Sequence, residues 1–513
     1  MSGTAQHAGD PPLRASAIFD TRRLKKALRA AGPPLLFGFR LWVSVCLALY
    51  VAFWLELDTP SWAGITAAIV CQPHLGASLR KGWFRMIGTP VGAVAIVVLT
   101  ACFPQDRCLF FLGLALWGAA CAFVSTILQN FAAYAAAVAG YTAVIVASDQ
   151  LGATGGLNGE AFMLAVTRVS EIGIGIVSAG VVLAGTDLGG ARRRLAGLFA
   201  GLTAGIAANF ARTLAAAGPE LPDTRPIRRD FLRRVIALDP VIDETLGESS
   251  RVRYHSPVLQ RAVDGLFAAL AGWRAVANHL ARLPFEQRRA EAAVILRALP
   301  AELLPLLEQP DPTRGTADPT DLHRIYEVAV RRLIAFPAGT PALRMLADKT
   351  AEALAGMSHA LNGLALLVAD PARPVSRHRG VFRLRVPDWL PAAVNAGRTF
   401  VTIGAVALYW IVSAWPSGAL AITWAAIPVI LFAPRADQPY AMAMGFVVRT
   451  GIAAVAAAII AFAVLPGLET FAAFCLAISV WLVPTGAAAA QPWQRVAFTY
   501  MSAYFVPPHL RTR

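Results

Sequence analysis

The sequence has few charged residues and little of the chemistry that enzymes use. Only 15% of its 513 residues are charged, whereas a soluble domain usually carries about 25%. A Walker A loop needs Gly-Lys followed by Ser or Thr, and no lysine of this chain lies in such a sequence. The eight histidines show no HExxH motif and no other metal-ligand spacing. We therefore expect no enzyme activity, no metal and no cofactor.

Cysteine is also scarce. The six cysteines form no CxxC pair, and most lie inside apolar runs, where a thiol is a small hydrophobic group. Cys102 and Cys108 flank a predicted turn. We expect two free thiols there, with a disulfide between them as the alternative.

The formal net charge is +15, but no nucleic-acid-recognition motif accompanies it. The basic residues lie at the ends of apolar runs and in the middle of the chain. Lysine and arginine concentrate in this way on the cytoplasmic flanks of membrane helices. The charge therefore favours a membrane protein and gives no support to a nucleic-acid partner.

Apolar residues make up 57% of the sequence and form two blocks, about 36–185 and 394–506. A bilayer core needs about 20 apolar residues in a helix. We expect six spans in the first block, at about 36–57, 61–73, 86–103, 109–128, 130–148 and 161–185. We expect five in the second, at about 394–414, 418–433, 443–465, 469–484 and 494–506. The predicted fold is therefore all-α and polytopic.

Basic residues recur on one side of these predicted spans. Arg80, Lys81 and Arg85 follow the second span, and Arg192–Arg194 follow the sixth. This bias places the N-terminus and the middle segment in the cytoplasm of a bacterial inner-membrane protein. The predicted domains are a cytoplasmic N-terminal segment 1–35, a membrane bundle 36–186, a cytoplasmic helical domain 187–390 and a second bundle 391–513.

The middle segment, 187–390, contains no run that we expect to span a bilayer. Its apolar residues recur at three- and four-residue spacing between arginines, as in amphipathic helices. The two flanking blocks match in order: Arg40 corresponds to Arg398, and Pro104 to Pro466. We therefore expect two parallel repeats, related by an axis along the membrane normal.

The most distinctive local pattern follows the second predicted span. Pro73 ends a helix, and Lys81 and Arg85 share a helical face at a spacing of four residues. Gly88 and Gly92 form a small-xxx-small pair that lets two helices approach closely. The pattern consists of Gln72, Pro73, Gly76, Ser78, Lys81, Arg85, Gly88, Thr89 and Gly92.

This pattern resembles the signature of the FUSC family of fusaric-acid-resistance and aromatic-carboxylate efflux proteins, and the layout of two blocks around a helical domain resembles that family along nearly the whole chain. The resemblance implies export of aromatic or hydroxylated carboxylic acids, often with a periplasmic membrane-fusion adaptor. Members usually have a longer second half. We therefore expect a truncated second bundle in this chain, which stops shortly after Pro507-Pro508.

Arg168 and Glu171 are charged residues within the sixth predicted span, on one face at a spacing of three. Charged residues inside a bilayer usually face a bundle interior or a water-filled path. Two interpretations stay open, proton coupling or substrate-anion binding on one side, and a structural pair near the interface on the other. The two residues also resemble an arginine–glutamate pair in the family's sixth helix.

The other candidates for a substrate pathway are aromatic or near the cytoplasmic edge. Tyr134 and Tyr141 share a face, with Asn130 below them, and offer either stacking for an aromatic substrate or ordinary packing. Arg398 offers either an anion contact or an interfacial anchor. Asp149 ends the fifth span, and we expect it to be solvated.

The leading hypothesis is a proton-coupled exporter of organic acids, with Glu171 as proton carrier and Arg168 as anion contact. The alternatives are a passive organic-anion channel and a membrane scaffold that transports nothing. The expected partners are the lipid bilayer, an organic-acid substrate, a periplasmic adaptor and further copies of the chain in a homo-oligomer.

Overall fold

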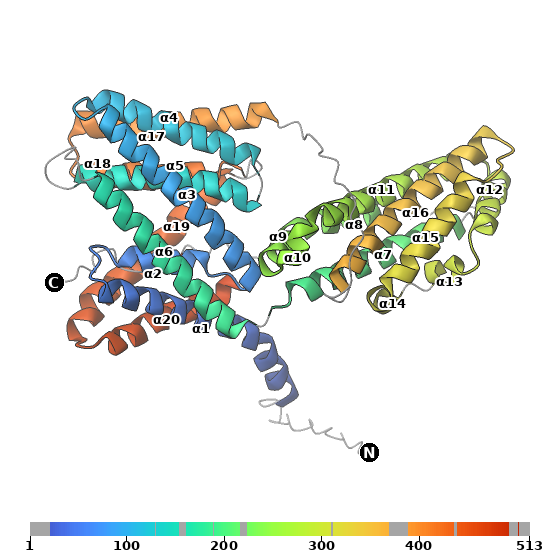
Figure 1. Ribbon diagram of the computed structural model, residues 1–513, viewed down its shortest axis with the longest axis horizontal. Helices are drawn as coiled ribbons and strands as arrows, with labels where there is room; N and C mark the ends of the chain where they lie inside the picture. Colours follow the sequence, from blue (N-terminus) through green and yellow to red (C-terminus); the bar gives the residue numbers. More distant parts are fainter. Residues whose placement is uncertain are drawn as a thin grey trace, which may run out of the picture. The chain divides into compact units, whose positions relative to one another are not determined.

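The computed structural model describes residues 21–128, 130–152, 161–187, 189–215, 223–308, 311–368, 388–434, 439–491 and Met501. Within these ranges every regular element is a helix, so the predicted all-α class is confirmed (Figure 1). The cysteines are free thiols, as expected for Cys102 and Cys108.

Within the described residues, ten helices are long and apolar enough to cross a membrane, which agrees with a polytopic protein. Their bounds are α1 (Thr21–Trp54, from Ala31), α3 (Leu75–Cys102), α4 (Arg107–Ile127), α5 (Asn130–Gly152), α6 (Ala161–Thr186), α7 (Ala191–Ala215), α16 (Pro341–Val368), α17 (Trp389–Ser413), α19 (Pro439–Ile459) continued by Ile460–Val464 and Leu465–Gly467, and α20 (Phe471–Ala489). Two further apolar helices, α2 (Ser61–Val70) and α18 (Gly418–Leu431), are shorter and occupy the predicted second span of each block. The last predicted span, 494–506, lies almost wholly outside the described residues.

Two of the ten helices, α7 and α16, lie in the middle segment, where we expected no run long enough to span. By length and composition that expectation is wrong. Both helices are rich in alanine, which raises a hydropathy average without making the whole surface apolar; their mean hydropathy of 1.2 is below the 1.7 to 2.1 of α3 to α6. Their apolar sides pack into one core with α11 and α15, including Phe199, Trp273 and Leu354.

The described chain divides into two compact units. The first unit contains the residues up to Cys71, the Glu171–Val182 part of α6, and those from Tyr440 onward. The second contains Gln72–Ser170 and Leu183–Pro439. The domain boundaries that we predict at residues 35, 186 and 390 stay predictions.

Packing within each unit pairs helices from the two predicted repeats. In the first unit α1 packs along α20, and Gly38 lies so close to the Val483 carbonyl that a Cβ would clash with it. In the second unit α17 packs along α4, and α18 packs on α5. The first helix of each block thus contacts the fourth helix of the other block. This reciprocity is what an internal duplication would produce, and the repeat itself stays a prediction.

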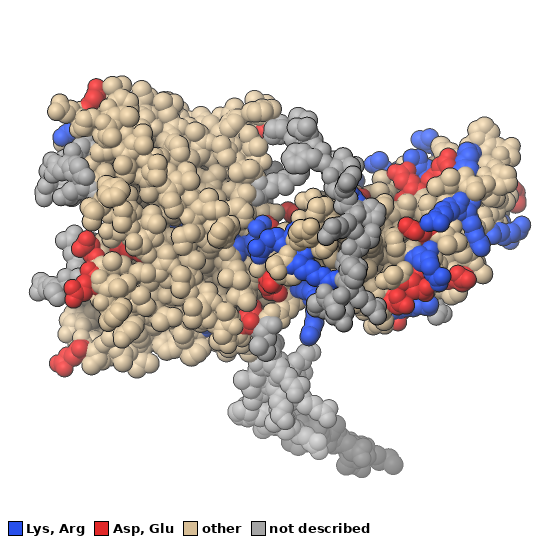
Figure 2. All heavy atoms as spheres, in the orientation of Figure 1, with Lys and Arg blue, Asp and Glu red and all other residues tan. Residues whose placement is uncertain are grey.

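The middle segment forms a layered set of helices around α11 and α16. Gly265 of α11 and Gly356 of α16 face each other at a close crossing, and Trp273 donates a 2.8 Å hydrogen bond to Thr213 inside the core. On the face shown in Figure 2, charged side chains gather over these helices. The remaining bounds are α8 (Arg225–Ile236), α9 (Leu238–Glu248), α10 (Ser250–Tyr254), α11 (Ser256–Arg282), α12 (Phe285–Ala298), α13 (Leu303–Glu308), α14 (Pro312–Ala317) and α15 (Pro319–Ile334).

Helix α3 connects the apolar part of the second unit to the middle segment. Its first turns pack on α9, where Gly76 and Gly247 lie against each other's helix. A Cβ on Gly76 would overlap the carbonyl of Glu244, and one on Gly247 would overlap the carbonyl of Gly76. Only glycine fits at both positions without moving a backbone. The remainder of α3 packs along α5.

Candidate functional site

A buried arginine on α3 is the centre of the first candidate site. Arg85 is only 2% exposed. Its Nη1 donates hydrogen bonds to the hydroxyls of Tyr134, at 2.7 Å, and Tyr141, at 3.0 Å. Both tyrosines are on α5, where a spacing of seven residues places them two turns apart on one face. The structure therefore joins two groups of residues that the sequence analysis treats separately.

Small residues of α3 bring α5 close enough for these contacts. A Cβ on Gly88 would overlap the carbonyl of Ala135, and one on Gly92 would overlap that of Ala139. Thr89, between them, is buried. This close crossing is what the small-xxx-small spacing predicts, and it holds the guanidinium against the tyrosine face of α5.

A second cation lies beside this group. The Lys81 ammonium is 5.5 Å from the ring centroid of Tyr134, within the range of a cation–π contact. We call Lys81, Arg85, Tyr134 and Tyr141 the α3–α5 cluster. It combines two positive charges, aromatic rings and hydroxyl groups, which are the groups that bind a carboxylate and the ring attached to it.

Two other predicted pathway residues have different surroundings. Asn130 begins α5 with a φ of +52°, and its amide donates a 2.8 Å hydrogen bond to Asp239 of α9. Arg398 is exposed on α17. Neither observation supports a role for these residues in the α3–α5 cluster.

The charged residues of α6 have partners on other elements. In the second unit Arg168 forms an ion pair with Asp149 of α5. The Asp149 side chain is 35% exposed, so its solvation stays a prediction, while its carboxylate neutralises the buried guanidinium of Arg168. Sequence spacing did not indicate this pair, which joins two helices.

Glu171 lies in the first unit and is fully buried. Its Oε1 accepts a hydrogen bond from Thr59 Oγ1, in the segment between α1 and α2. A carboxyl group without water contact keeps its charge only where hydrogen bonds or cations compensate for lost hydration. The direct pairing of Arg168 with Glu171 that the spacing predicts stays a prediction.

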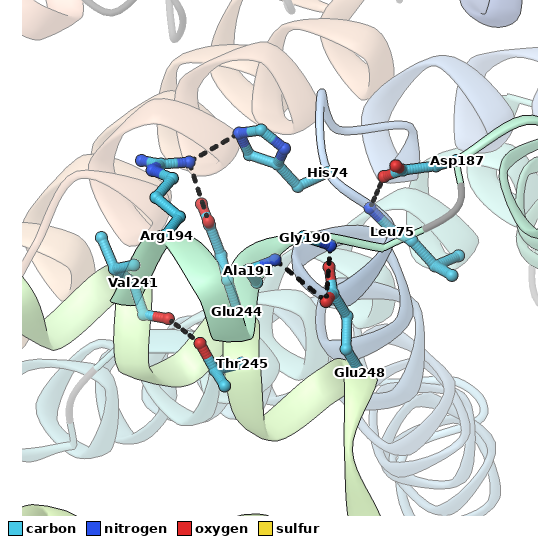
Figure 3. A network of polar contacts seen from close by, with 10 residues as sticks. All are labelled: His74, Leu75, Asp187, Gly190, Ala191, Arg194, Val241, Glu244, Thr245 and Glu248. Carbon is cyan, nitrogen blue, oxygen red and sulfur yellow. Dashed lines mark hydrogen bonds and ion pairs between the residues drawn. The ribbon is translucent and has the colours of Figure 1, made fainter. Parts of the chain in front are cut away.

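The beginning of the family-like pattern lies at the packing of α3 on the middle segment, which Figure 3 shows from close by. The backbone amide of Leu75, at the start of α3, donates to Asp187 at 2.8 Å. Just before it, Ser78 Oγ accepts the amide of Gln72 at 3.0 Å, which stabilises the turn at Pro73. These contacts define where α3 begins.

Acidic residues of α9 hold the starts of both α3 and α7. Arg194 of α7 contacts His74 at 2.7 Å and Glu244 at 3.5 Å (Figure 3). Glu248 accepts the backbone amides of Gly190 and Ala191, at 3.3 and 3.1 Å, at the N-terminus of α7. Sequence analysis missed these acids, since a helix that reads as ordinary and amphipathic does not show which side meets another helix.

Asp243, also on α9, pairs with Arg80 of α3 at 2.9 Å. Burial raises the pKa of the Asp243 carboxyl, and the hydrogen bond from Arg80 opposes that shift.

The pattern from Gln72 to Gly92 thus has two parts. Its first part attaches α3 to α9, and its second part forms the α3–α5 cluster.

No group of three or more His, Cys, Asp and Glu side chains that could hold a metal occurs in the described part of the chain.

Comparison with known proteins finds relatives that are named as efflux pump subunits or as transporters. The chain is 26% identical over 476 residues to the p-hydroxybenzoic acid efflux pump subunit AaeB of Edwardsiella tarda, covering 86% of this chain and 66% of that protein. It is 27% identical to AaeB of Pantoea ananatis, covering 86% and 66%. It is 33% identical to the uncharacterized transporter YdhK of Escherichia coli over 147 residues, 29% of this chain and 22% of that protein.

The chain therefore spans about two thirds of the length of the AaeB proteins that it matches. Together with the ten apolar helices of the described residues, this similarity indicates a multi-pass bacterial membrane protein. The sequence model of the fusaric acid resistance protein family matches residues 34–509 of this chain. The chain belongs to the fusaric acid resistance protein family.

Proposed function

We propose that this chain exports aromatic carboxylic acids across the bacterial inner membrane and that the α3–α5 cluster is its substrate site. The observation that carries the proposal is the buried guanidinium of Arg85 bonded to two tyrosine hydroxyls. The AaeB relatives, named as p-hydroxybenzoic acid efflux pump subunits, support this class of substrate.

The chemistry of the cluster fits a ring that carries a carboxylate. A guanidinium binds a carboxylate through two parallel hydrogen bonds. The tyrosine rings offer stacking surface, and their hydroxyls can exchange a bond to Arg85 for one to a phenolic substrate. Charged groups are kept inside bilayers mainly where they act on substrates or ions.

The position of the cluster along α3 fits an entry site. Arg85 is ten residues beyond Leu75, so it lies about 15 Å along the helix from its start. That start packs on α9 of the middle segment. If the middle segment is cytoplasmic, as the arginine bias predicts, the cluster faces substrate arriving from the cytoplasm.

Proton coupling is the finer part of the proposal. Glu171 is the proton carrier, since its buried carboxyl has a hydroxyl donor in Thr59 and can change its charge during transport. Arg168, which we expected to hold the substrate anion, is instead paired with Asp149 and supports the structure around the pathway. We therefore assign the contact with the substrate anion to Arg85 in place of Arg168. A periplasmic adaptor and a homo-oligomer stay predictions.

The test is transport of labelled 4-hydroxybenzoate into inverted membrane vesicles that contain wild-type protein or the Arg85→Gln variant. We expect the apparent affinity to fall about 10- to 100-fold, because a charged hydrogen bond contributes about 1.5–3 kcal/mol. Tyr134→Phe should have a smaller effect, since the ring remains.

The matched control is Arg398→Gln, which removes an exposed arginine from another helix of the same unit. It should transport at the wild-type rate when protein amounts are equal. Wild-type affinity in Arg85→Gln would remove the cluster from the substrate pathway. Transport that continues after a protonophore collapses the gradient would favour the passive-channel alternative.

A further inference from the structure

A groove in the middle segment, remote in sequence from the α3–α5 cluster, has the composition of a second anion site. Its volume is about 470 Å³, and it lies where the end of α12 meets the end of α15 and the turn after it. The lining includes Arg297, Arg332, Val294, Ala298, Phe336 and Pro337. Two guanidinium groups thus border a mainly apolar floor.

The two arginines of the groove differ from their neighbours on α15. Arg324 pairs with Asp321 at 2.8 Å, and Arg331 contacts Glu327 at 3.4 Å. Among the residues that the structure describes, neither Arg297 nor Arg332 has an acidic side chain within ion-pair distance. The groove therefore carries two positive charges that no carboxylate of the described residues pairs with.

One side of the groove is held in place by a third arginine. Arg344 of α16 donates hydrogen bonds to the carbonyls of Leu333, Ile334 and Phe336, at 2.9, 3.2 and 2.8 Å. These bonds satisfy carbonyls at the end of α15 and fix the turn that carries Phe336. A turn fixed before binding does not have to be ordered by a ligand, which favours affinity.

We propose that this groove binds a small aromatic carboxylate, with its carboxylate between Arg297 and Arg332 and its ring on Phe336 and Pro337. The charge selects an anion, and the apolar floor selects one that carries a ring. The volume is within the roughly 300–1,000 Å³ of small-molecule sites. A protein partner would need about 800 Å² on its side of the interface, far more than this groove offers.

Binding here would connect α12 to α15 without involving the transport pathway. The site would allow the middle segment to respond to the concentration of organic acid. This inference does not rest on the proposed function, since the groove can bind an acid whether or not the chain exports one.

The experiment is photolabelling of the detergent-purified full chain with 4-azidobenzoate, followed by mass spectrometry of the labelled peptides. We expect label on peptides from α12 and from 332–337, and competition by unlabelled benzoate. Arg297→Gln with Arg332→Gln should lower this labelling at least about tenfold, because two charge-assisted bonds are lost. The neutral probe 4-azidobenzamide should label these peptides weakly.

The matched control is Arg324→Gln with Arg331→Gln. It also removes two positive charges, both from α15, but leaves the residues of the groove intact. It should label as the wild type does. Arg85→Gln should also leave groove labelling unchanged, which separates this site from the α3–α5 cluster. Absence of label from the groove peptides in the wild type, or equal labelling in the groove variant, overturns the proposal. Thermal unfolding of every variant confirms that the compared proteins are folded.

Discussion

Carboxylates of the apolar helices and carboxylates of the middle segment carry the same charge in different surroundings. Glu171 of α6 has no exposed surface, and it accepts a hydrogen bond from a neutral hydroxyl, that of Thr59. Asp243 of α9 is 9% exposed and pairs with Arg80. Asp311, before α14, is exposed and accepts hydrogen bonds from Thr313. The series runs from no water contact to full water contact.

The difference teaches where a carboxylate is functional and where it is only structural. Removing a charged group from water is unfavourable, so a chain keeps such a group in an apolar bundle where the charge is used. An exposed carboxylate loses little hydration and gains little from a partner. Changing each acid to its amide, which preserves shape, measures this gradient directly.

The largest effect is expected at Glu171. Glu171→Gln keeps an oxygen that can accept from Thr59 but cannot take up or release a proton. Gradient-driven export should therefore fall to the level of membranes without the protein. The measurement is transport of labelled 4-hydroxybenzoate into inverted vesicles with and without an imposed proton gradient.

The matched control is Glu56→Gln, the same change at an exposed residue after α1. It should leave export unchanged. If Glu171→Gln accumulates substrate in response to the gradient as the wild type does, Glu171 is not the proton carrier and its burial has a structural explanation.

A smaller effect, in stability, is expected at Asp243. Burial raises the pKa of this carboxyl, so its ionised form is less favourable in the folded protein than in the unfolded chain. Asp243→Asn removes that penalty and still accepts from Arg80, so the stability should change by less than about 1 kcal/mol. Asp243→Ala leaves the guanidinium without its acceptor and should cost about 1–3 kcal/mol.

The pH dependence of stability tests the direction of the pKa shift of Asp243. Because the folded pKa is raised, the stability contributed by Asp243 is fully present below about pH 4, its ordinary range, and is lost as the pH rises through the folded pKa. The midpoint of thermal unfolding of the wild type should therefore fall relative to Asp243→Asn as the pH rises from that range. An unchanged difference between the two proteins at all pH values would contradict this account.

These residues also show how far the sequence predicts the structure. The seven-residue spacing of Tyr134 and Tyr141 placed them on one face, and the spacing of Gly88 and Gly92 predicted a close helix crossing. Periodicity identifies the face of a helix but not its neighbour, so the hydrogen bonds to Arg85 could not be predicted. The error over α7 and α16 has a related cause, since hydropathy does not show whether lipid or another helix covers an apolar side.

The partners of charged residues were the hardest to predict, because local spacing favours pairs on one helix. Local spacing predicted a pair between Arg168 and Glu171. In the structure Arg168 pairs with Asp149 of α5, and Glu171 accepts a hydrogen bond from Thr59, which lies outside α6. Such pairs depend on the tertiary fold. The acids of α9 that bind the starts of α3 and α7 were missed for the same reason.

The smallest effect is expected at Asp311, the N-cap of α14. Hydrogen bonds from the Thr313 hydroxyl and amide lower the pKa of this carboxyl, so its contribution to stability is present above the ordinary range near pH 4 and is lost as the pH falls through the folded pKa. That direction is opposite to the one for Asp243. Asp311→Asn keeps a good N-cap and should leave the midpoint of thermal unfolding at pH 7 unchanged, while Asp311→Ala should lower it slightly. The contrary outcome is that Asp311→Asn lowers the midpoint of thermal unfolding as much as Asp243→Ala does. That result would show that contact with water does not determine how much each carboxylate matters, and the ranking from Glu171 to Asp311 would have to be abandoned.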